Sequence, residues 1–188
     1  MRAALRVSQW NAKTCAIGAP IAQLHSMVLL GSVSRSRLCQ RSAWQTPRVD
    51  DWPEAEGRVR ASFARQGFMH HLGARLVAVG PGSCAISCAP RAELSQQHGF
   101  VHAGVVAAIA DSAAGYAALS LTPPGSEVLT VEFKLNLLAP AAGELLIARG
   151  RVLRPGRTLT VCEATVAAVL DGVETPCAIL LSTMIRRG

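Results

Sequence analysis

Residues 98–120, "HGFVHAGVVAAIADSAAGYAALS", are a long run of small apolar residues with one carboxylate, Asp111, in the middle. A helix over residues 103–119 is apolar on nearly every side, so other parts of the chain have to enclose it. A transmembrane span is the competing interpretation, because the run is close to the length that crosses a bilayer. Asp111, His102 and the excess of Ala over Leu and Ile favour a helix enclosed by a curved sheet.

Strand-like segments lie on both sides of this run. Two short apolar segments flank a turn at Pro81 and Gly82, and four longer ones follow after residue 125, with turn residues between them. A first helix is expected from Asp51, a candidate N-cap, to a stop near Gly67. The expected strands lie within residues 74–79, 83–89, 127–137, 143–154, 157–171 and 173–187. This order predicts an α+β fold with antiparallel strands around a long helix.

The segment 127–137, "EVLTVEFKLNL", alternates apolar and polar residues almost completely. Such alternation is typical of a strand with one buried side. Thr130 falls among the residues of the polar side. The apolar side is expected to hold Leu129, Val131, Phe133, Leu135 and Leu137.

The 188-residue chain is long enough for one domain with a substantial core. Its net charge of +7 comes from residues 1–49, which hold seven Lys or Arg residues and no acid. From Asp50 onward twelve basic and twelve acidic residues cancel, and aromatic residues are few. We therefore expect one domain over residues 50–188 that binds no nucleic acid.

Residues 1–49 combine Ser and Arg without any acid, a composition typical of mitochondrial transit peptides. A basic flexible extension, or translation from an upstream start codon, explains the same composition, and we favour this simpler interpretation. The apolar segment 21–31 within it is too short to cross a bilayer. The expected location is therefore cytoplasmic, or mitochondrial if the segment is a transit peptide.

The six cysteines lack the paired spacing of a zinc site. Cys84 and Cys88 have the same parity on an expected strand, so they point to one face and pack as small apolar side chains. We expect reduced thiols in the core, and neither a metal nor a cofactor.

The segment "SQQHGFVHAG", residues 95–104, leads into the long helix. The first N–H groups of a helix have no partner within it and lie at the positive end of its dipole. They can stabilise the oxyanion of an acyl transfer, while a carboxylate opposite attacks the carbonyl or activates water. Asp111 lies nine residues after His102, or about 13 Å along one helix. The helix-start N–H groups and the carboxylate are therefore expected to reach one carbonyl from two different helices, which predicts a dimer.

The Asp111 carboxylate also has a simpler interpretation, as a partner of backbone groups or of a neighbouring subunit without any chemistry. On a helical wheel it shares a face with small residues only, so a second backbone or a slender ligand can come close. This face holds Gly104, Ala108, Gly115 and Ala118.

The order of these pieces resembles one protein family. Gln96, "HGFVHAG", Asp111 nine positions after His102, "LNLLAPA" and "GELLIARGRVLRPGRT" together are similar to PaaI-like acyl-CoA thioesterases of the hotdog fold. The resemblance covers residues 68–186. It implies a long central helix wrapped by a curved antiparallel sheet of about five to six strands. It also implies an acyl-CoA substrate and a homodimer or homotetramer with active sites at the subunit interface.

The resemblance implies roles for individual residues. Asp111 is the catalytic nucleophile or general base, and Gln96 holds substrate or water. The family's "HGG" falls on His102, Ala103 and Gly104, so the Ala103 N–H polarises the thioester carbonyl. His102 is expected to cap the helix or orient the loop rather than to act as the base.

Other positions follow from the same resemblance. Thr130 stands where some relatives carry a Ser or Thr that positions the hydrolytic water. Gly99, Gly104 and Gly115 are the glycines expected along the substrate groove. Ala103 departs from the family's Gly, which adds a methyl group where the acyl group approaches.

Arg154 and Arg157 bracket a Pro-Gly turn and are candidates to bind the phosphates of coenzyme A, although charges in solvent on a turn explain them equally well. Two other functions remain open. A non-catalytic acyl-CoA-binding or structural hotdog protein would not need Asp111. A hotdog dehydratase would carry its His and acid at a different spacing, which this sequence does not show.

Overall fold

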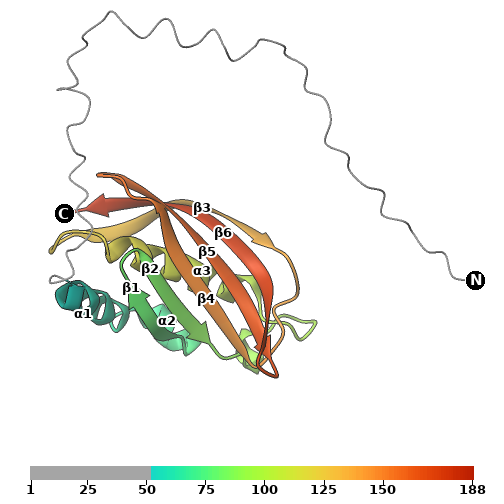
Figure 1. The fold of residues 1–188 in the computed structure, drawn as a ribbon. Coiled ribbons are helices and arrows are strands. Elements are labelled where there is room, and N and C mark those ends of the chain that lie inside the picture. Colours follow the sequence, from blue (N-terminus) through green and yellow to red (C-terminus); the bar gives the residue numbers. More distant parts are fainter. Residues whose placement is uncertain (1–51) are drawn as a thin grey trace, which may run out of the picture. The chain divides into compact units, whose positions relative to one another are not determined.

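The computed structural model describes residues 52–188, which form one antiparallel sheet and a long helix along one of its faces (Figure 1). The strands are β1 (Arg75–Gly80), β2 (Ser83–Cys88), β3 (Glu127–Leu137), β4 (Leu145–Arg154), β5 (Leu159–Leu170) and β6 (Val173–Arg187). The helices are α1 (Trp52–Phe63), α2 (Gly67–Leu72), the short 3-10 helix η3 (Ala92–Leu94) and α3 (Ala103–Leu119). The six strands run in the order β1-β2-β4-β5-β6-β3. The predicted α+β hotdog fold is therefore confirmed.

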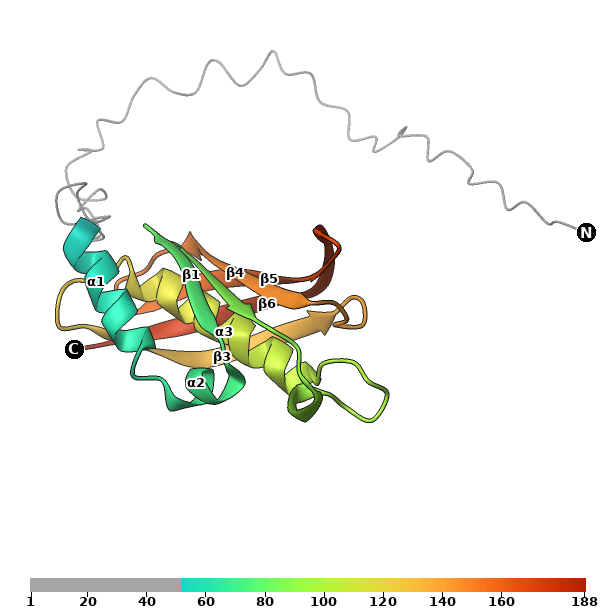
Figure 2. The ribbon, with the colours of Figure 1, turned by 90° about the horizontal axis from the view of Figure 1, so that it is seen from below.

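The basic extension over residues 1–49 and the expected cap at Asp51 lie outside the described residues. Figure 2 shows α3 lying along the sheet, with α1 and α2 next to it. The side of α3 against the sheet is lined by small and branched apolar residues. Its fully buried residues are Ile109, Ala110, Ala113, Ala114 and Ala117. Among residues 52–188, no helix combines the length and the apolar character needed to cross a membrane.

Gly150 on β4 marks a very close approach of α3 to the sheet. A Cβ at this position would lie 2.3 Å from the carbonyl oxygen of Ala113. We expect Gly150→Ala to lower the free energy of unfolding by about 3 kcal/mol, because the helix has to move away from the strand. Urea denaturation at one fixed protein concentration measures this loss.

Gly57→Ala is the matched control, since a Cβ at Gly57 in α1 has no neighbour within 4 Å. Ala is the better helix former by about 1 kcal/mol, so this variant should be as stable as the wild type or more stable. If both variants unfolded at the urea concentration of the wild type, the close approach at Gly150 would be wrong.

The first helix ends earlier than the sequence predicted. α1 ends at Phe63, and Gly67 begins α2 instead of stopping α1. Gln66 has an extended backbone, with φ −77° and ψ 97°, and this separates the two helices. Gly73 supplies the stop at φ 67°, and its N–H donates to the carbonyl of His70. This left-handed conformation favours Gly, which explains the position of the stop.

β3 is an edge strand with a bulge that changes the predicted alternation. The pairing with β6 shifts just after Thr130, which pairs with Met184. Phe133 pairs with Ser182, two positions away on β6, so Thr130 and Phe133 share the face toward α3. The prediction that placed them on opposite sides is wrong. Leu129 turns to the outer face instead.

The four described cysteines are free thiols in the core, which confirms the prediction for Cys84 and Cys88. Burial raises the pKa of the Cys84 and Cys162 thiols to about 12, so both stay protonated at neutral pH. Within residues 52–188, no group of three or more His, Cys, Asp or Glu side chains is placed to hold a metal ion.

Candidate active site

Asp111 lies in the middle of α3 and is joined to β3 by a hydrogen bond. The Thr130 Oγ1 donates to the Asp111 Oδ1 over 2.8 Å. The bulge in β3 allows this contact, because it turns Thr130 toward α3. Two residues that are 19 positions apart in sequence therefore share one site, where Thr130 orients the carboxylate.

The environment raises the pKa of the Asp111 carboxyl. Burial is the main cause, because it disfavours the charged form, and the hydrogen bond from Thr130 opposes it. No Lys or Arg in the part of the chain described forms an ion pair with Asp111. A carboxylate of this kind is a stronger base than an ordinary surface Asp, and it is a candidate for acid–base or nucleophilic chemistry.

Asp111 opens onto a cavity of about 200 Å³, which we call the Asp111 cavity. Its walls come from α1, the α1–α2 junction, α3, β3 and β6. The lining residues are Ser62, Gln66, Asp111, Ser112, Gly115, Tyr116, Leu119, Glu127, Val128, Thr130 and Met184. Gln66 and Ser62 were not expected here, because the sequence marks them only as part of a first helix. Their place depends on how α1 packs on α3.

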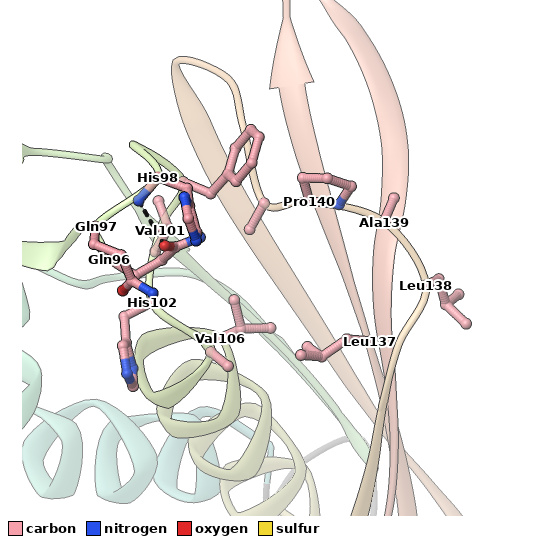
Figure 3. A pocket seen from close by; sticks show the side chains of 13 residues that line it. Gln96, Gln97, His98, Val101, His102, Val106, Leu137, Leu138, Ala139 and Pro140 are labelled. Carbon is pink, nitrogen blue, oxygen red and sulfur yellow. Dashed lines mark hydrogen bonds between the residues drawn. The ribbon is translucent and has the colours of Figure 1, made fainter.

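A second cavity, of about 560 Å³, lies at the start of α3, and we call it the helix-start cavity (Figure 3). Gln96 and His102 line it on the side of α3, with Leu137 at the end of β3 and Pro140 just after β3 across from them. The Gln96 Oε1 accepts a hydrogen bond from the His98 N–H over 2.7 Å. This bond fixes the side-chain amide at the cavity wall.

His102 caps α3, in the role expected for it. Its Nδ1 accepts from the Gly104 N–H over 2.9 Å, and its carbonyl accepts from the Val105 N–H over 2.9 Å. The Ala103 N–H makes no hydrogen bond within residues 52–188, and Ala103 lines the helix-start cavity. The helix start therefore offers one free donor at this cavity, at the positive end of the helix dipole.

The two cavities lie at different places along one α3. Ala103 and Asp111 are eight residues apart, which is about 12 Å of helix. A carbonyl in contact with both would have to lie within about 3 Å of each. Within one subunit, the carboxylate and the free N–H therefore cannot act on the same carbonyl.

The predicted small-residue face of α3 is open only in part. Gly115 lines the Asp111 cavity. Ala118 is only 2% exposed, so other parts of the chain cover the face at this position. In the same turn of α3, the ring of Tyr116 meets the ring of Phe63 on α1, with centroids 5.7 Å apart.

Four of the predicted binding residues line neither cavity: Gly99, Gly104, Arg154 and Arg157. The two glycines lie around the start of α3, where Gly99 forms a turn at φ 83°. The two arginines are exposed at the β4–β5 turn, at the end of the sheet where β3 begins. Because the two arginines line neither cavity, they are candidates for contacts with the outer part of a ligand only.

Residues 98–172 match the family model of the thioesterase superfamily. This segment contains the helix start, Asp111 and Thr130. Most of the residues that form the two cavities therefore fall within the matched segment.

The chain is also similar to solved structures. A thioesterase family protein from Silicibacter pomeroyi is 48% identical, with 70% of this chain and 97% of that chain covered and a TM-score of 0.69. Two more distant structures share the fold. PaaI from the phenylacetic acid degradation operon of E. coli is 20% identical, with 73% and 96% covered and a TM-score of 0.64. A thioesterase from Haemophilus influenzae is 20% identical, with 68% and 87% covered and a TM-score of 0.62. The chain belongs to the thioesterase superfamily.

Proposed function

We propose that this chain hydrolyses acyl-CoA thioesters in a dimer, with each active site formed between the two subunits. Asp111 of one subunit faces the start of α3 in the other. The observation that carries the proposal is the separation of the two groups within one chain. The carboxylate and the free Ala103 N–H each line a cavity, and about 12 Å of helix lies between them.

The exposed side of β3 supports a dimer. On the face toward α3, Phe133 and Leu137 are 45% and 55% exposed. Leu137 lines the helix-start cavity, and Thr130, earlier on β3, lines the Asp111 cavity. β3 is also an edge strand, whose free backbone groups can pair with a second strand. Pairing β3 with its own copy extends the sheet across a two-fold axis and brings the two α3 helices side by side.

The exposed residues of α3 fit this arrangement. Antiparallel helices that bring Asp111 opposite the partner's Ala103 cross near Ala107, the midpoint between these positions. Ala107 and Ala108 are partly exposed, and their small side chains allow two helices to approach closely. The same crossing makes both active sites equivalent.

In this arrangement the partner's Ala103 N–H donates to the thioester carbonyl oxygen and stabilises the negative charge that develops there. Asp111 either takes a proton from a water that attacks the carbonyl carbon, or attacks the carbon itself and forms an anhydride that water then cleaves. In both routes the carbon–sulfur bond breaks and the thiolate of coenzyme A takes up a proton. The Gln96 amide, fixed by His98, is placed to hold substrate or water.

Thr130→Val should move the acidic limb of the pH profile of kcat/KM to higher pH. The Thr130 hydroxyl stabilises the ionised form of Asp111, so its loss raises the pKa of the carboxyl further. Because the ionised carboxylate is the active form, more of the enzyme is inactive at a given acidic pH. Thr130→Ser keeps the hydroxyl and should leave the limb in place. An unshifted limb in Thr130→Val would contradict the role of this hydrogen bond.

The proposal also gives a role to the exposed arginines and a range to the catalytic domain. We assign Arg154 and Arg157 to the phosphates of coenzyme A, because they are exposed cations at the end of the sheet where β3 begins, and β3 carries Glu127 and Thr130 of the Asp111 cavity. We assign the reaction to one domain over residues 50–188.

A non-catalytic acyl-CoA-binding protein is the alternative, because it would keep the fold and the dimer. Release of free thiol from short, medium, long and aromatic acyl-CoAs by the purified full chain separates the two functions. The enzyme proposal predicts release above background for at least one class. Binding of acyl-CoA without release of thiol from any class would support the alternative.

A further inference from the structure

We propose that the Asp111 cavity receives the acyl group of the substrate, and that Gln66 selects short acyl groups that carry a neutral hydroxyl. The inference rests on the proposed function and names its substrate class. It concerns a wall of the cavity that lies outside α3 and β3, which supply the catalytic groups.

The volume of the cavity limits the acyl group. At about 200 Å³, the Asp111 cavity is smaller than the roughly 300–1,000 Å³ of sites for drug-sized ligands. We infer that it receives a short acyl group in preference to a long alkyl chain.

The wall of the Asp111 cavity is more polar than expected for a site that binds a plain alkyl group. Seven of the eleven lining residues carry polar side-chain atoms, whereas small-molecule sites are mostly apolar. Thr130 is bonded to Asp111, and Ser62 interacts with Tyr116, which opposes the rise that burial causes in the pKa of the Tyr116 hydroxyl. Gln66, by contrast, makes no side-chain hydrogen bond within the part of the chain described, and neither does Ser112.

The position of Gln66 explains why its amide is free. It has an extended backbone between α1 and α2, and its side chain does not cap α2. Its carbonyl is occupied, since it accepts from the His70 N–H over 3.1 Å. The carboxamide, half-buried at the cavity wall, is left with donors and an acceptor for a group inside the cavity.

The charges of the wall favour a neutral partner over an anionic one. Asp111 and Glu127 both line the cavity, and no cationic side chain is among its lining residues. An acyl group with a second carboxylate would meet like charges. A hydroxyl can donate to one of these carboxylates and accept from Gln66, so it satisfies groups that a methyl would leave unpaired.

A matched pair of substrates tests this selection. 3-hydroxybutanoyl-CoA and 3-methylbutanoyl-CoA differ only by a hydroxyl in place of a methyl on the same carbon. The full-length wild type should prefer the hydroxyl substrate by at least about tenfold in kcat/KM, because a site built for a hydroxyl rejects its methyl analogue. It should also hydrolyse dodecanoyl-CoA and succinyl-CoA more slowly than the hydroxyl substrate.

Gln66→Met keeps the length of the side chain and removes its hydrogen-bonding groups. We expect it to reduce the hydroxyl preference at least about fivefold, through a loss on 3-hydroxybutanoyl-CoA with little change on 3-methylbutanoyl-CoA. Ser112→Ala should reduce the preference in the same direction but by less. His71→Met is the control, because His71 is exposed on α2 and lines neither cavity. It should keep the wild-type preference.

The outcomes separate this inference from the proposed function. Hydrolysis of both matched substrates at equal rates, faster turnover of dodecanoyl-CoA, or an equal loss on both substrates in Gln66→Met would each overturn the selection by Gln66 while leaving a thioesterase. Absence of hydrolysis for every acyl-CoA would overturn the proposed function and the inference together. Thermal unfolding of Gln66→Met near the wild-type Tm confirms that a lost preference is not a lost fold.

Discussion

Asp111→Asn is expected to lower kcat/KM for acyl-CoA hydrolysis by about 1,000-fold or more without unfolding the protein. The amide has the shape of the carboxylate and can still accept from Thr130, but it is neither a base nor an effective nucleophile. Thiol release by the two proteins at equal concentration measures the loss. A variant that hydrolyses as fast as the wild type would contradict the assignment of Asp111, even with the activity itself established.

The same variant should be more stable than the wild type at neutral pH. Burial raises the pKa of the Asp111 carboxyl in the folded state. Protonation of this group therefore adds to the free energy of unfolding at low pH, and this gain is lost as the pH rises through the folded-state pKa. At neutral pH the wild type therefore carries the cost of a partly buried charge. Asn removes that charge, and we expect Tm to rise by about 2–4 °C, or about 1 kcal/mol. A lower Tm at neutral pH would show that the carboxylate is structural.

Ala103→Pro is expected to lower kcat/KM by about 100-fold while keeping α3 intact. The only group it removes at the backbone is the free N–H that we assign to the carbonyl oxygen, and loss of one such donor typically costs 10²–10³-fold. Pro fits this position because it is the first residue of the helix, and His102 before it has φ −62° and ψ 139°. Thiol release at saturating and limiting substrate measures the effect.

Ala103→Gly is the control for this prediction. It keeps the N–H and restores the Gly of the family pattern, so it should hydrolyse acyl-CoA at least as fast as the wild type. Circular dichroism of Ala103→Pro should match that of the wild type. Full activity in a folded Ala103→Pro enzyme would exclude the Ala103 N–H as the donor.

The sequence was sufficient to predict the long enclosed helix, because a run of small apolar residues leaves few alternatives once strands surround it. β1 and β2 also lie on the two sides of the turn at Pro81 and Gly82, as predicted. These features depend on local pattern, which one sequence carries. The cap by His102 was one of two roles expected from the family resemblance.

Other features depend on packing between distant segments, and the predictions about them were wrong or absent. The bulge in β3 leaves no clear pattern in "EVLTVEFKLNL", so Thr130 was placed on the wrong side of its strand. Gln66 was hidden within one predicted helix, because the break before Gly67 is set by how α1 and α2 pack. The sequence also does not show which segments cover the small-residue face, so the burial of Ala118 was not predicted.

The central claim is that each site is shared between two subunits, and a mixed dimer tests it most directly. Asp111→Asn and Ala103→Pro chains with different affinity tags are expressed together, and the dimer that carries both tags is purified. In this dimer one site combines the intact Asp111 of one chain with the intact Ala103 of the other, and the second site lacks both. We predict that it recovers about half of the thiol release of the wild-type dimer, far above either parent variant. Thiol release no higher than that of the parents would contradict the shared site.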